Sequence, residues 1–377
     1  MSDSVPSSDL SGAILSGRVQ LVRRIGTGGM GVVYEATTVG RGARVAVKLL
    51  RPEFIGDRNV HDRFLDEAKV CLGLNHPTVV NFLDVGTAED GTPYLVMEYL
   101  DGVPLSAYTA HSARTPMKHA VPIMVGVLQG LAYAHSAGVV HRDLKPENVF
   151  LARDAAGKFL PKILDFGVAK VLDAAGGIGK KTATGMLLGT PAYMSPEQVQ
   201  NAREVDPRSD LFSIGTILYE MLSGKVAFDA PTEFERMSAV LSYEPPELAS
   251  LDPSLSPISP IVARAMKKDR AARFQTATEM ANALLAIEPS IAPAISIAPP
   301  PEAPSDAKGP HGTLASAPER VSAPVFPVSS VVVDSPMFIP ELRRPAARAI
   351  PRWAIPLAVA IGIVLGVVAT VLAFHLT

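Results

Sequence analysis

The sequence predicts an α+β fold with two lobes, and three features of the pattern support this. Short apolar segments bounded by turn residues fill the first part of a long globular stretch, as is typical of β-strands. Segments with helical apolar spacing fill the remainder, after Pro116. A strand-rich part followed by a helix-rich part indicates two lobes and not one uniform sheet.

The elements follow in order along the chain. Residues 1–18 are rich in Ser, Asp and Gly and show little periodicity, so they predict a flexible leader. Strands are expected at residues 19–25, 32–38, 45–50, 80–85 and 94–99. Helices are expected at residues 61–74, 117–137, 210–223, 233–241 and 260–267. Together these elements predict one globular domain over residues 19–287.

Charge and cysteine content exclude some classes of function. The formal net charge is −2, which gives no support to a nucleic-acid partner, and none is expected. Cys71 is the only cysteine, which excludes an internal disulfide and a cysteine-cluster metal site and fits a reducing compartment. It lies on the apolar face of the helix expected at 61–74, so we expect it to pack inward. Residues 1–20 lack the pattern of a signal peptide.

Residues 288–352 differ in composition from the globular stretch. Pro, Ala and Ser dominate, and no repeating apolar face is present. Such a composition buries too little apolar surface to offset the entropy of ordering. We therefore expect a disordered juxtamembrane linker.

Residues 353–376 predict a transmembrane helix. Within it, residues 354–376 are almost wholly apolar and, as a helix, would be about 34 Å long, enough for a hydrocarbon core of about 30 Å. Trp353 stands where an interfacial aromatic residue is expected. Basic residues crowd its N-terminal side: Arg343, Arg344, Arg348 and Arg352. The positive-inside rule then predicts a single-pass protein of the inner cell membrane, with the globular domain cytoplasmic and the C-terminus at the opposite face.

Gly362 and Gly366 form a GxxxG pair within this span. Such a pair lets two helices approach closely, which would give a homodimer. Glycine is also common in membrane helices that do not pair, so both alternatives stay open.

A glycine-rich run lies between the first two expected strands, at residues 26–33, GTGGMGVV. Glycines let a hairpin approach phosphates with its backbone N–H groups. A dinucleotide-binding motif is disfavoured, because a strand and not a helix follows the run. Lys48 then ends an alternating apolar strand, VAVK.

Two polar motifs carry the chemistry: HRDLKPEN at residues 141–148 and DFG at residues 165–167. Phosphoryl transfer needs mainly positioning and the cancellation of negative charge. It requires a carboxylate that accepts a hydroxyl proton and oxygen ligands that hold Mg²⁺. Asp143, Asn148 and Asp165 supply these oxygens.

In this order, the motifs resemble those of the eukaryotic-like (Hanks-type) serine/threonine protein kinases of bacteria. The match covers residues 19–287 and continues with GTPAYMSPE at 189–197 and DLFSIG at 210–215. The resemblance implies the bilobal protein-kinase fold, with a β-rich N-lobe and an α-rich C-lobe. It also implies ATP and Mg²⁺ as cofactors, with Mn²⁺ as a substitute.

The resemblance implies a role for each motif residue in the reaction. Lys48 would contact the α- and β-phosphates and pair with Glu67, with Asp66 as the alternative partner. Asp143 would be the catalytic base and Lys145 would steady the γ-phosphate. The remaining implied residues are Thr190, which would bond near the catalytic aspartate, and the metal ligands Asn148 and Asp165.

A further set is implied to surround the nucleotide. Met97 would be the gatekeeper, and residues 98–100 the hinge that offers backbone hydrogen bonds. The full implied set, besides Lys48, is Ile25, Gly26, Gly28, Gly31, Val33, Ala46, Met97, Glu98 and Leu100.

The activation segment is expected at residues 165–197. By the resemblance, Arg142 pairs with a phosphate on this segment, and Thr182 and Thr184 are the candidate autophosphorylation sites. The alternative is that both threonines are ordinary polar loop residues. Glu197 is expected to form a structural ion pair with Arg273.

The sequence therefore predicts a membrane-tethered serine/threonine protein kinase that transfers the γ-phosphate of ATP to Ser and Thr hydroxyls of proteins. One alternative is a catalytically weak pseudokinase scaffold that binds ATP at the membrane. It is disfavoured because no catalytic motif residue is missing. A kinase of small molecules is disfavoured by residues 189–197, which in the family shape a peptide groove.

Overall fold

The computed structural model describes residues 9–28, 31–50, 65, 68–69, 71–110, 114–153, 158–166, 191–201 and 204–287. The expected linker at 288–352 and the expected transmembrane helix at 353–376 lie outside these residues. Within the described ranges, no helix combines the length and the apolar character that crossing a membrane requires.

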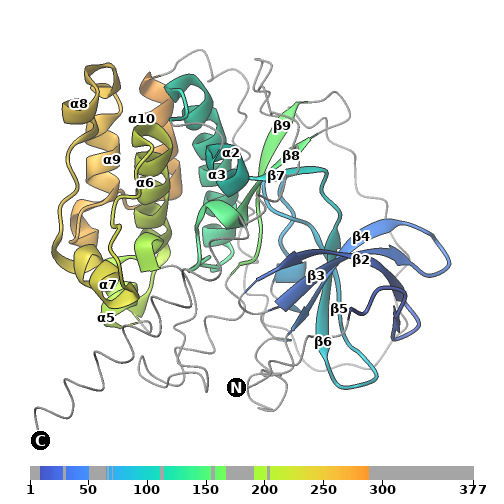
Figure 1. The fold of residues 1–377 in the computed structure, drawn as a ribbon. Coiled ribbons are helices and arrows are strands. Elements are labelled where there is room, and N and C mark those ends of the chain that lie inside the picture. Colours follow the sequence, from blue (N-terminus) through green and yellow to red (C-terminus); the bar gives the residue numbers. More distant parts are fainter. Residues whose placement is uncertain are drawn as a thin grey trace, which may run out of the picture. The chain divides into compact units, whose positions relative to one another are not determined.

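A six-stranded antiparallel sheet forms the first lobe (Figure 1). Its strands are β1 (Ile14–Leu15), β2 (Val19–Thr27), β3 (Gly31–Thr38), β4 (Arg44–Leu50), β5 (Phe82–Thr87) and β6 (Pro93–Glu98). They lie in the order β1-β2-β3-β4-β6-β5. Four of these strands, β2, β3, β4 and β6, match the expected ones closely, and β5 begins two residues later than expected.

The two faces of this sheet differ because successive strand residues point to opposite sides. One face forms a continuous apolar core, to which each of the longer strands except β5 contributes. Its members include Leu21, Tyr34, Ala36, Val47, Leu49, Tyr94 and Val96. The residues between them, Val33, Ala46, Lys48 and Met97, therefore share the other face.

Residues 9–18 were expected to belong to a flexible leader, but in the structure they pack against this sheet. Ile14 pairs with Gln20 and Leu15 with Val19, so β1 adds an edge strand beside β2. Leu15 is buried in the apolar core, and the amide of Leu10 donates to the hydroxyl of Tyr34. So short a strand, with a single buried residue, is too brief to show periodicity in the sequence.

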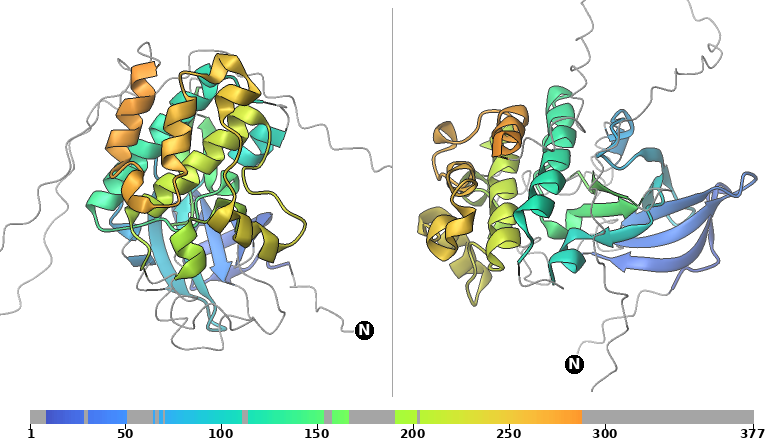
Figure 2. Two further views of the ribbon diagram at one scale, coloured as in Figure 1. Left: turned by 90° about the vertical axis from the view of Figure 1, so that its left-hand side faces the viewer. Right: turned by 90° about the horizontal axis from the view of Figure 1, so that it is seen from above.

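Helices form the second lobe, with two longer helices at its centre (Figures 1 and 2). They are α3 (Met117–Ser136) and α6 (Pro207–Ser223). Within the described ranges, the other α-helices of this lobe are α2 (Leu105–Ala110), α5 (Pro196–Gln200), α7 (Glu233–Ser242), α8 (Leu248–Leu251), α9 (Ser259–Ala265) and α10 (Ala277–Ile287). Short 3₁₀ turns lie at Pro146–Asn148, Pro191–Tyr193, Pro253–Leu255 and Arg270–Ala272.

Helix α6 is buried on nearly every side, so its ends are fixed by local chemistry. The Asp206 side chain caps its N-terminus by accepting from the amide of Arg208, and Pro207 occupies the first turn. Gly224 ends the helix in the left-handed conformation, with φ of 73°, which a glycine adopts without strain. The helix that carries the polar side chains of α6 is thus fixed at both ends.

A three-stranded sheet lies between the sheet of the first lobe and the helices. Its strands are β7 (Gly102–Pro104), β8 (Val149–Arg153) and β9 (Phe159–Ile163), in the order β7-β8-β9. The amide of Val80 donates to the carbonyl of Ile163 at 2.9 Å, and the amide of Ile163 to the carbonyl of Thr78 at 2.8 Å. These bonds join β9 to the chain just before β5, so they link the two lobes.

Helix α3 lies close to β9 because two glycines, one turn apart, face it. A Cβ atom on Gly126 would lie 2.6 Å from Cγ of Pro161, and one on Gly130 would lie 2.6 Å from Oγ1 of Thr78 and 2.9 Å from Cδ1 of Ile163. These distances are far shorter than van der Waals contact. The glycines therefore set how closely α3 approaches β9.

The expected α+β arrangement, with a β-rich and an α-rich lobe, is confirmed. The helix expected at 61–74 lies mainly outside the described residues, but 65, 68–69 and 71–72 are helical. Cys71 is buried, as expected. Besides β1, the sequence analysis missed the strands β7, β8 and β9 and the helices α2, α5, α8 and α10.

Candidate active site

The loop that carries Asp143 is held by hydrogen bonds to helix α6. Asp210 in the first turn of this helix accepts three hydrogen bonds: from His135 Nε2 at 2.7 Å, from the amide of His141 at 2.9 Å and from the amide of Arg142 at 2.9 Å. Burial alone would raise the pKa of Asp210, but the hydrogen bond and charge of His135, together with the amide of His141, outweigh burial and lower the pKa. A fully buried carboxylate is thus kept ionised by directed donors.

His141 connects this loop to the chain before Asp165. Its Nε2 lies 2.7 Å from the carbonyl of Leu164, and its Nδ1 accepts from the amide of Asp143 at 3.2 Å. Since a carbonyl can only accept, Nε2 carries the proton and the ring is neutral. Burial lowers the pKa of His141, in agreement with this tautomer. The ring also packs against Phe166, with centroids 4.9 Å apart.

Asp143, Lys145 and Asn148 converge at one point of the loop. The Asn148 side-chain amide donates to the Asp143 carbonyl at 2.7 Å and to the Asp143 carboxylate at 3.1 Å. Lys145 Nζ lies 3.2 Å from Oδ2 of the same carboxylate. The carbonyl of Asn148 accepts from the amide of Leu164 at 2.8 Å, so Asn148 is also fixed relative to Asp165. Three residues with expected roles are therefore brought together.

Lys48 and Asp165 meet between the lobes. Lys48 Nζ, from β4, lies 2.8 Å from Asp165 Oδ1, and both side chains are partly shielded from solvent. Asp165 has a φ of 44°, in the left-handed region that a non-glycine residue rarely adopts. Glu67, the expected partner of Lys48, lies outside the described residues, as do Thr182, Thr184 and Thr190.

The expected nucleotide-binding residues share one face of the first sheet. Val33 pairs with both Gly26 and Lys48, and Ala46 pairs with Met97. Residues directly opposite in antiparallel strands point to the same side, so these side chains lie on the face opposite the apolar core.

The glycine-rich turn leads from β2 to β3 beside this face. The amide of Gly28 donates to the carbonyl of Gly31 at 2.9 Å, and residues 29–30 lie outside the described part. A Cβ atom on Gly31 would lie only 2.4 Å from the carbonyl oxygen of Leu49. Glycine is required at this position because β3 and β4 approach so closely. Ile25, just before the turn, is exposed.

Glu98 begins the segment that contains Leu100, and it is held by two groups. Its carboxylate accepts from the amide of Asn81 at 2.7 Å and pairs with Lys162 Nζ at 2.5 Å. The amide of Glu98 donates to the carbonyl of Asn81 at 2.9 Å. A nucleotide hydrogen bond from Glu98 therefore cannot use this N–H group.

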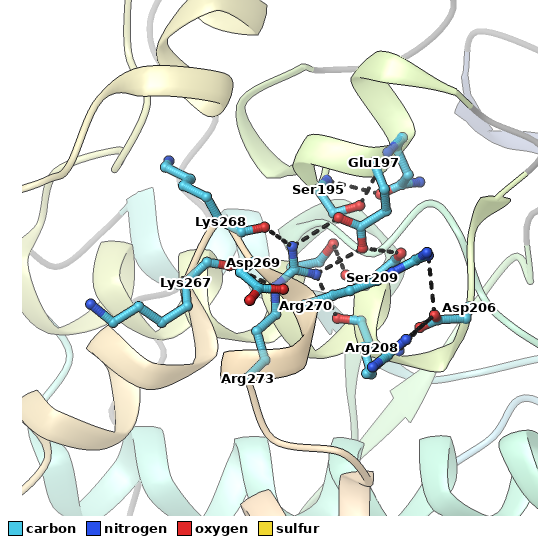
Figure 3. A network of polar contacts seen from close by, with 12 residues as sticks. Ser195, Glu197, Asp206, Arg208, Ser209, Lys267, Lys268, Asp269, Arg270 and Arg273 are labelled. Carbon is cyan, nitrogen blue, oxygen red and sulfur yellow. Dashed lines mark hydrogen bonds and ion pairs between the residues drawn. The ribbon is translucent and has the colours of Figure 1, made fainter.

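Glu197 and Arg273 form the expected ion pair (Figure 3). Arg273 Nη1 and Nη2 donate to the two carboxylate oxygens of Glu197 at 2.7 and 2.8 Å. The guanidinium also donates to the carbonyls of Lys267, Lys268 and Arg208, so all of its nitrogens are engaged. Ser209 donates a further bond to Glu197. The pair anchors the end of the 165–197 segment to the helical lobe.

Sequence reasoning assigned no role to several residues that hold the site. They are His135, Lys162, Gln198 and the side chain of Asp210. Asp210 stood within the quoted DLFSIG motif, which was the available signal. The others are connected to the site by contacts between residues far apart in the chain, which spacing does not reveal.

Comparison with known proteins agrees with this architecture. The model of the family described as protein kinase domain matches residues 19–286. The chain is 38% identical over 278 residues to the serine/threonine-protein kinase Pkn2 of Myxococcus xanthus, covering 72% of this chain and 33% of that protein. It is 37% identical over 310 residues to the serine/threonine-protein kinase PknA of Mycobacterium tuberculosis, covering 81% of this chain and 69% of that protein.

The crystal structure of the Mycobacterium tuberculosis PknI kinase domain is similar, with a TM-score of 0.57. The identity is 27%, and the match covers 73% of this chain and 97% of that one. Since the family model matches well over half of the chain, the chain belongs to the protein kinase family and contains a serine/threonine kinase domain of the bacterial Hanks type.

Proposed function

We propose that the protein is an ATP-dependent serine/threonine protein kinase that phosphorylates proteins and its own activation segment while tethered to the cell membrane. The observation that carries the proposal is the convergence of Lys145 and Asn148 on Asp143, with Lys48 paired to Asp165 from the other lobe. These residues are contributed by both lobes, as a site that holds a nucleotide between them requires.

The residues present fit a divalent cation. Asn148 directs its amide nitrogen to Asp143, which leaves Oδ1 for a ligand, and Asp165 Oδ2 lies beside the oxygen that contacts Lys48. Both are hard oxygen ligands of the kind that Mg²⁺ prefers, with phosphate oxygens completing its coordination. Among the described residues, no cluster of three His, Cys, Asp or Glu side chains could hold a metal alone. When bound, Mg²⁺ or Mn²⁺ would neutralise charge that develops on the phosphates.

Transfer would proceed with each group in a stated role. The Asp143 carboxylate accepts the proton of a substrate Ser or Thr hydroxyl, whose oxygen attacks the γ-phosphorus of ATP. The bond from that phosphorus to the bridging oxygen breaks, and ADP leaves with the electron pair. Lys145 and Lys48 carry positive charge beside the γ-phosphate and the α/β-phosphates, respectively.

Adenine would lie against the sheet face that carries Val33, Ala46 and Met97. Val33, Ala46 and Met97 make this part of the face apolar, as a flat aromatic base requires, with the polar residues Lys48 and Glu35 beside them. Ile25, Gly26, Gly28 and Gly31 would cover the phosphates, and Leu100 with the carbonyl of Glu98 would contact the base edge.

Activation would involve Arg142. Its side chain has no hydrogen bond or ion pair to the described residues, whereas its backbone is held at both ends. A phosphate on Thr182 or Thr184 would supply the charge-assisted partner that a guanidinium favours. Glu67 would pair with Lys48, and Thr190 would bond near Asp143.

The test of the kinase proposal uses the full chain in detergent with labelled ATP and Mg²⁺, beside an Asp143→Asn variant. We expect label on Ser or Thr of the protein and of an added protein substrate, and none with the variant. ATP binding without transfer would overturn the proposal in favour of a scaffold.

Membrane tethering rests on the apolar run at residues 353–376 and on the arginines before it. Residues 1–8 and 288–352 would then be flexible segments on the cytoplasmic side, and lipid would surround the helix. Gly362 and Gly366 would allow a homodimer.

The test of topology replaces the native cysteine by Cys71→Ser and adds either Thr377→Cys or Ser4→Cys. In intact cells, a membrane-impermeant maleimide should label only the first of these. Labelling of neither, or of both, would contradict the proposed single pass.

A further inference from the structure

Gln198 on α5 contacts the backbone of the catalytic loop. Its side-chain Nε2 donates to the carbonyl of Arg142 at 2.7 Å, a bond between residues 56 positions apart. The contact lies one residue before Asp143, the proposed base. No motif in the sequence assigns Gln198 a part in the reaction.

The backbone of Arg142 needs such support. Its φ is 64°, in the left-handed region that is strained for a residue with a Cβ atom. Strained residues persist only where their surroundings hold them in place. The amide of Arg142 donates to Asp210 on α6 and its carbonyl accepts from Gln198 on α5. Two different helices thus hold the two ends of one residue.

The bond from Gln198 also sets the peptide plane that leads into Asp143. This plane contains the carbonyl of Arg142, which accepts from Gln198, and the amide of Asp143, which donates to Nδ1 of His141. A peptide unit is planar, so fixing its oxygen and its N–H group fixes its orientation. The direction in which the Asp143 side chain leaves the backbone follows from that orientation.

Gln198 is itself held in place by a capping box. Its side-chain Oε1 accepts from the backbone amide of Ser195 at 3.0 Å, and its backbone amide donates to Oγ of Ser195 at 3.4 Å. Ser195 is buried, and the neighbouring Glu197 is anchored by Arg273 (Figure 3). The Gln198 side chain therefore uses its oxygen for the cap and its nitrogen for the catalytic loop.

We propose that Gln198 is a positioning residue for Asp143, which ties the end of the 165–197 segment to the loop that carries the base. The proposal rests on the proposed kinase function. Its consequence is that the placement of α5 affects the orientation of Asp143 directly, through one amide group.

A rival interpretation is that Gln198 only caps α5. Gln198→Glu separates the two, because glutamate is equally suited to a capping box and favourable at a helix N-terminus. The variant keeps an acceptor for the amide of Ser195 but presents an ionised oxygen to the carbonyl of Arg142. A cap-only role therefore predicts no loss of stability and no loss of turnover.

A positioning role predicts that kcat falls about tenfold, because small displacements of a catalytic group have large effects on rate. The KM for ATP should change little, since Gln198 contacts none of the residues assigned to the nucleotide. As the pH is lowered toward about 5, a protonated glutamate can donate to the carbonyl of Arg142. The ratio of variant to wild-type kcat should then rise.

Two further variants complete the design, and every variant is made in the full chain. Gln198→Met removes the donor without adding charge, so kcat should fall with no recovery at low pH. Gln200→Glu makes the same chemical change at an exposed position of the same helix and should leave kcat unchanged. Hydrogen exchange of the amides at residues 141–144 should be faster in both Gln198 variants.

The outcomes distinguish this proposal from the proposed function. If the wild-type chain transfers phosphate and Gln198→Glu stays within about twofold of it at every pH, the positioning role is wrong, since a displaced base would lower kcat more. If the wild-type chain transfers none, the kinase proposal fails and amide exchange decides alone. Unchanged exchange in both Gln198 variants would overturn the tie between α5 and the loop.

Discussion

The ammonium group of Lys48 lies 2.8 Å from Oδ1 of Asp165, and this contact joins the sheet of one lobe to the chain just after β9 in the other. Lys48 is placed by its register with Val33 on one side and Leu95 on the other. Asp165 is placed by the bonds of Leu164 to Asn148 and His141. A cation and a carboxylate from separate lobes are thus held at ion-pair distance.

Replacing Lys48 should remove catalysis and leave the fold intact. For Lys48→Met we expect kcat/KM to fall at least about 100-fold, because a charge that stabilises the transferring phosphates is lost. The thermal unfolding midpoint should shift by no more than in Lys118→Met, an exposed lysine on α3 that serves as the control. Equal kcat/KM in the two variants would contradict the role of Lys48.

The Glu197–Arg273 pair should contribute to stability in a way that depends on both partners. Arg273→Met leaves a shielded carboxylate without its guanidinium and should lower the free energy of unfolding by about 3–5 kcal/mol. The double variant Glu197→Gln, Arg273→Met should lose much less than the sum of the two single changes, as urea unfolding would measure. Additive losses would exclude direct coupling.

The same pair predicts that the free energy of unfolding depends on pH in the acid range. Burial alone would raise the pKa of Glu197, but hydrogen bonds from Arg273 and Ser209 outweigh burial and hold the pKa below its ordinary 4.5. The contribution to stability is therefore full above that pH and is lost as the pH falls through the lower folded-state pKa. The difference in unfolding free energy between wild type and Glu197→Gln should narrow over this range.

Lys268 predicts a pH dependence of the same sign, but at alkaline pH. Its Nζ is buried, has no hydrogen-bond partner among the residues that the structure describes, and lies 4.2 Å from the ring centroid of Phe228. Burial lowers the pKa of Lys268 to about 8 from 10.5, opposed by the charge of Glu244 and assisted by that of Arg273. Because the unfolded chain binds more protons between these two values, the free energy of unfolding should rise with pH across them.

Lys268→Met tests this point. It should stabilise the protein by about 1 kcal/mol at neutral pH, a modest figure because solvent screens a half-buried side chain. The advantage should shrink as the pH rises from about 8 and disappear above 10.5, where the wild-type lysine is neutral in both the folded and the unfolded chain. Thermal unfolding of both proteins across the range would measure it, and a constant difference would contradict the prediction.

Asp210→Asn should loosen the catalytic loop. An asparagine turns part of the acceptor into an NH₂ group that faces backbone donors, so we expect a loss of about 2–4 kcal/mol in unfolding free energy. Turnover should fall as well, since Arg142 and His141 lose their anchor. The control is Asp229→Asn, whose carboxylate is largely exposed beside Arg236. Similar unfolding curves for the two variants would count against the anchor.

Much of the fold could be predicted because its signals are local. The alternating strands β2, β3, β4 and β6 and the helices α3, α6 and α7 each show their own periodicity, and the structure places them within a few residues of expectation. The sheet β7-β8-β9 was missed because three short strands give little periodicity and pair across distant segments.

The candidate site likewise has residues that the sequence predicts and residues that it does not. The motifs that carry Lys48, Asp143 and Asp165 stand out in the sequence, as does the Glu197–Arg273 pair by resemblance. The groups that orient them do not, because Asp210 reaches a loop 68 residues away and Gln198 one 56 residues away. Packing decides which side chain bonds to a given backbone group, and the spacing of residues along the chain does not reveal it.

Gly126 and Gly130 limit how this sequence can diverge. Any other residue at either position would place a Cβ atom inside Pro161, Thr78 or Ile163, so α3 would have to move away from β9. Because β9 ends two residues before Asp165, such a movement would displace that carboxylate from Lys48. Substitutions can therefore accumulate freely on the solvent side of α3, while relatives that still transfer phosphate should keep glycine, or compensate with a smaller partner, at these two positions.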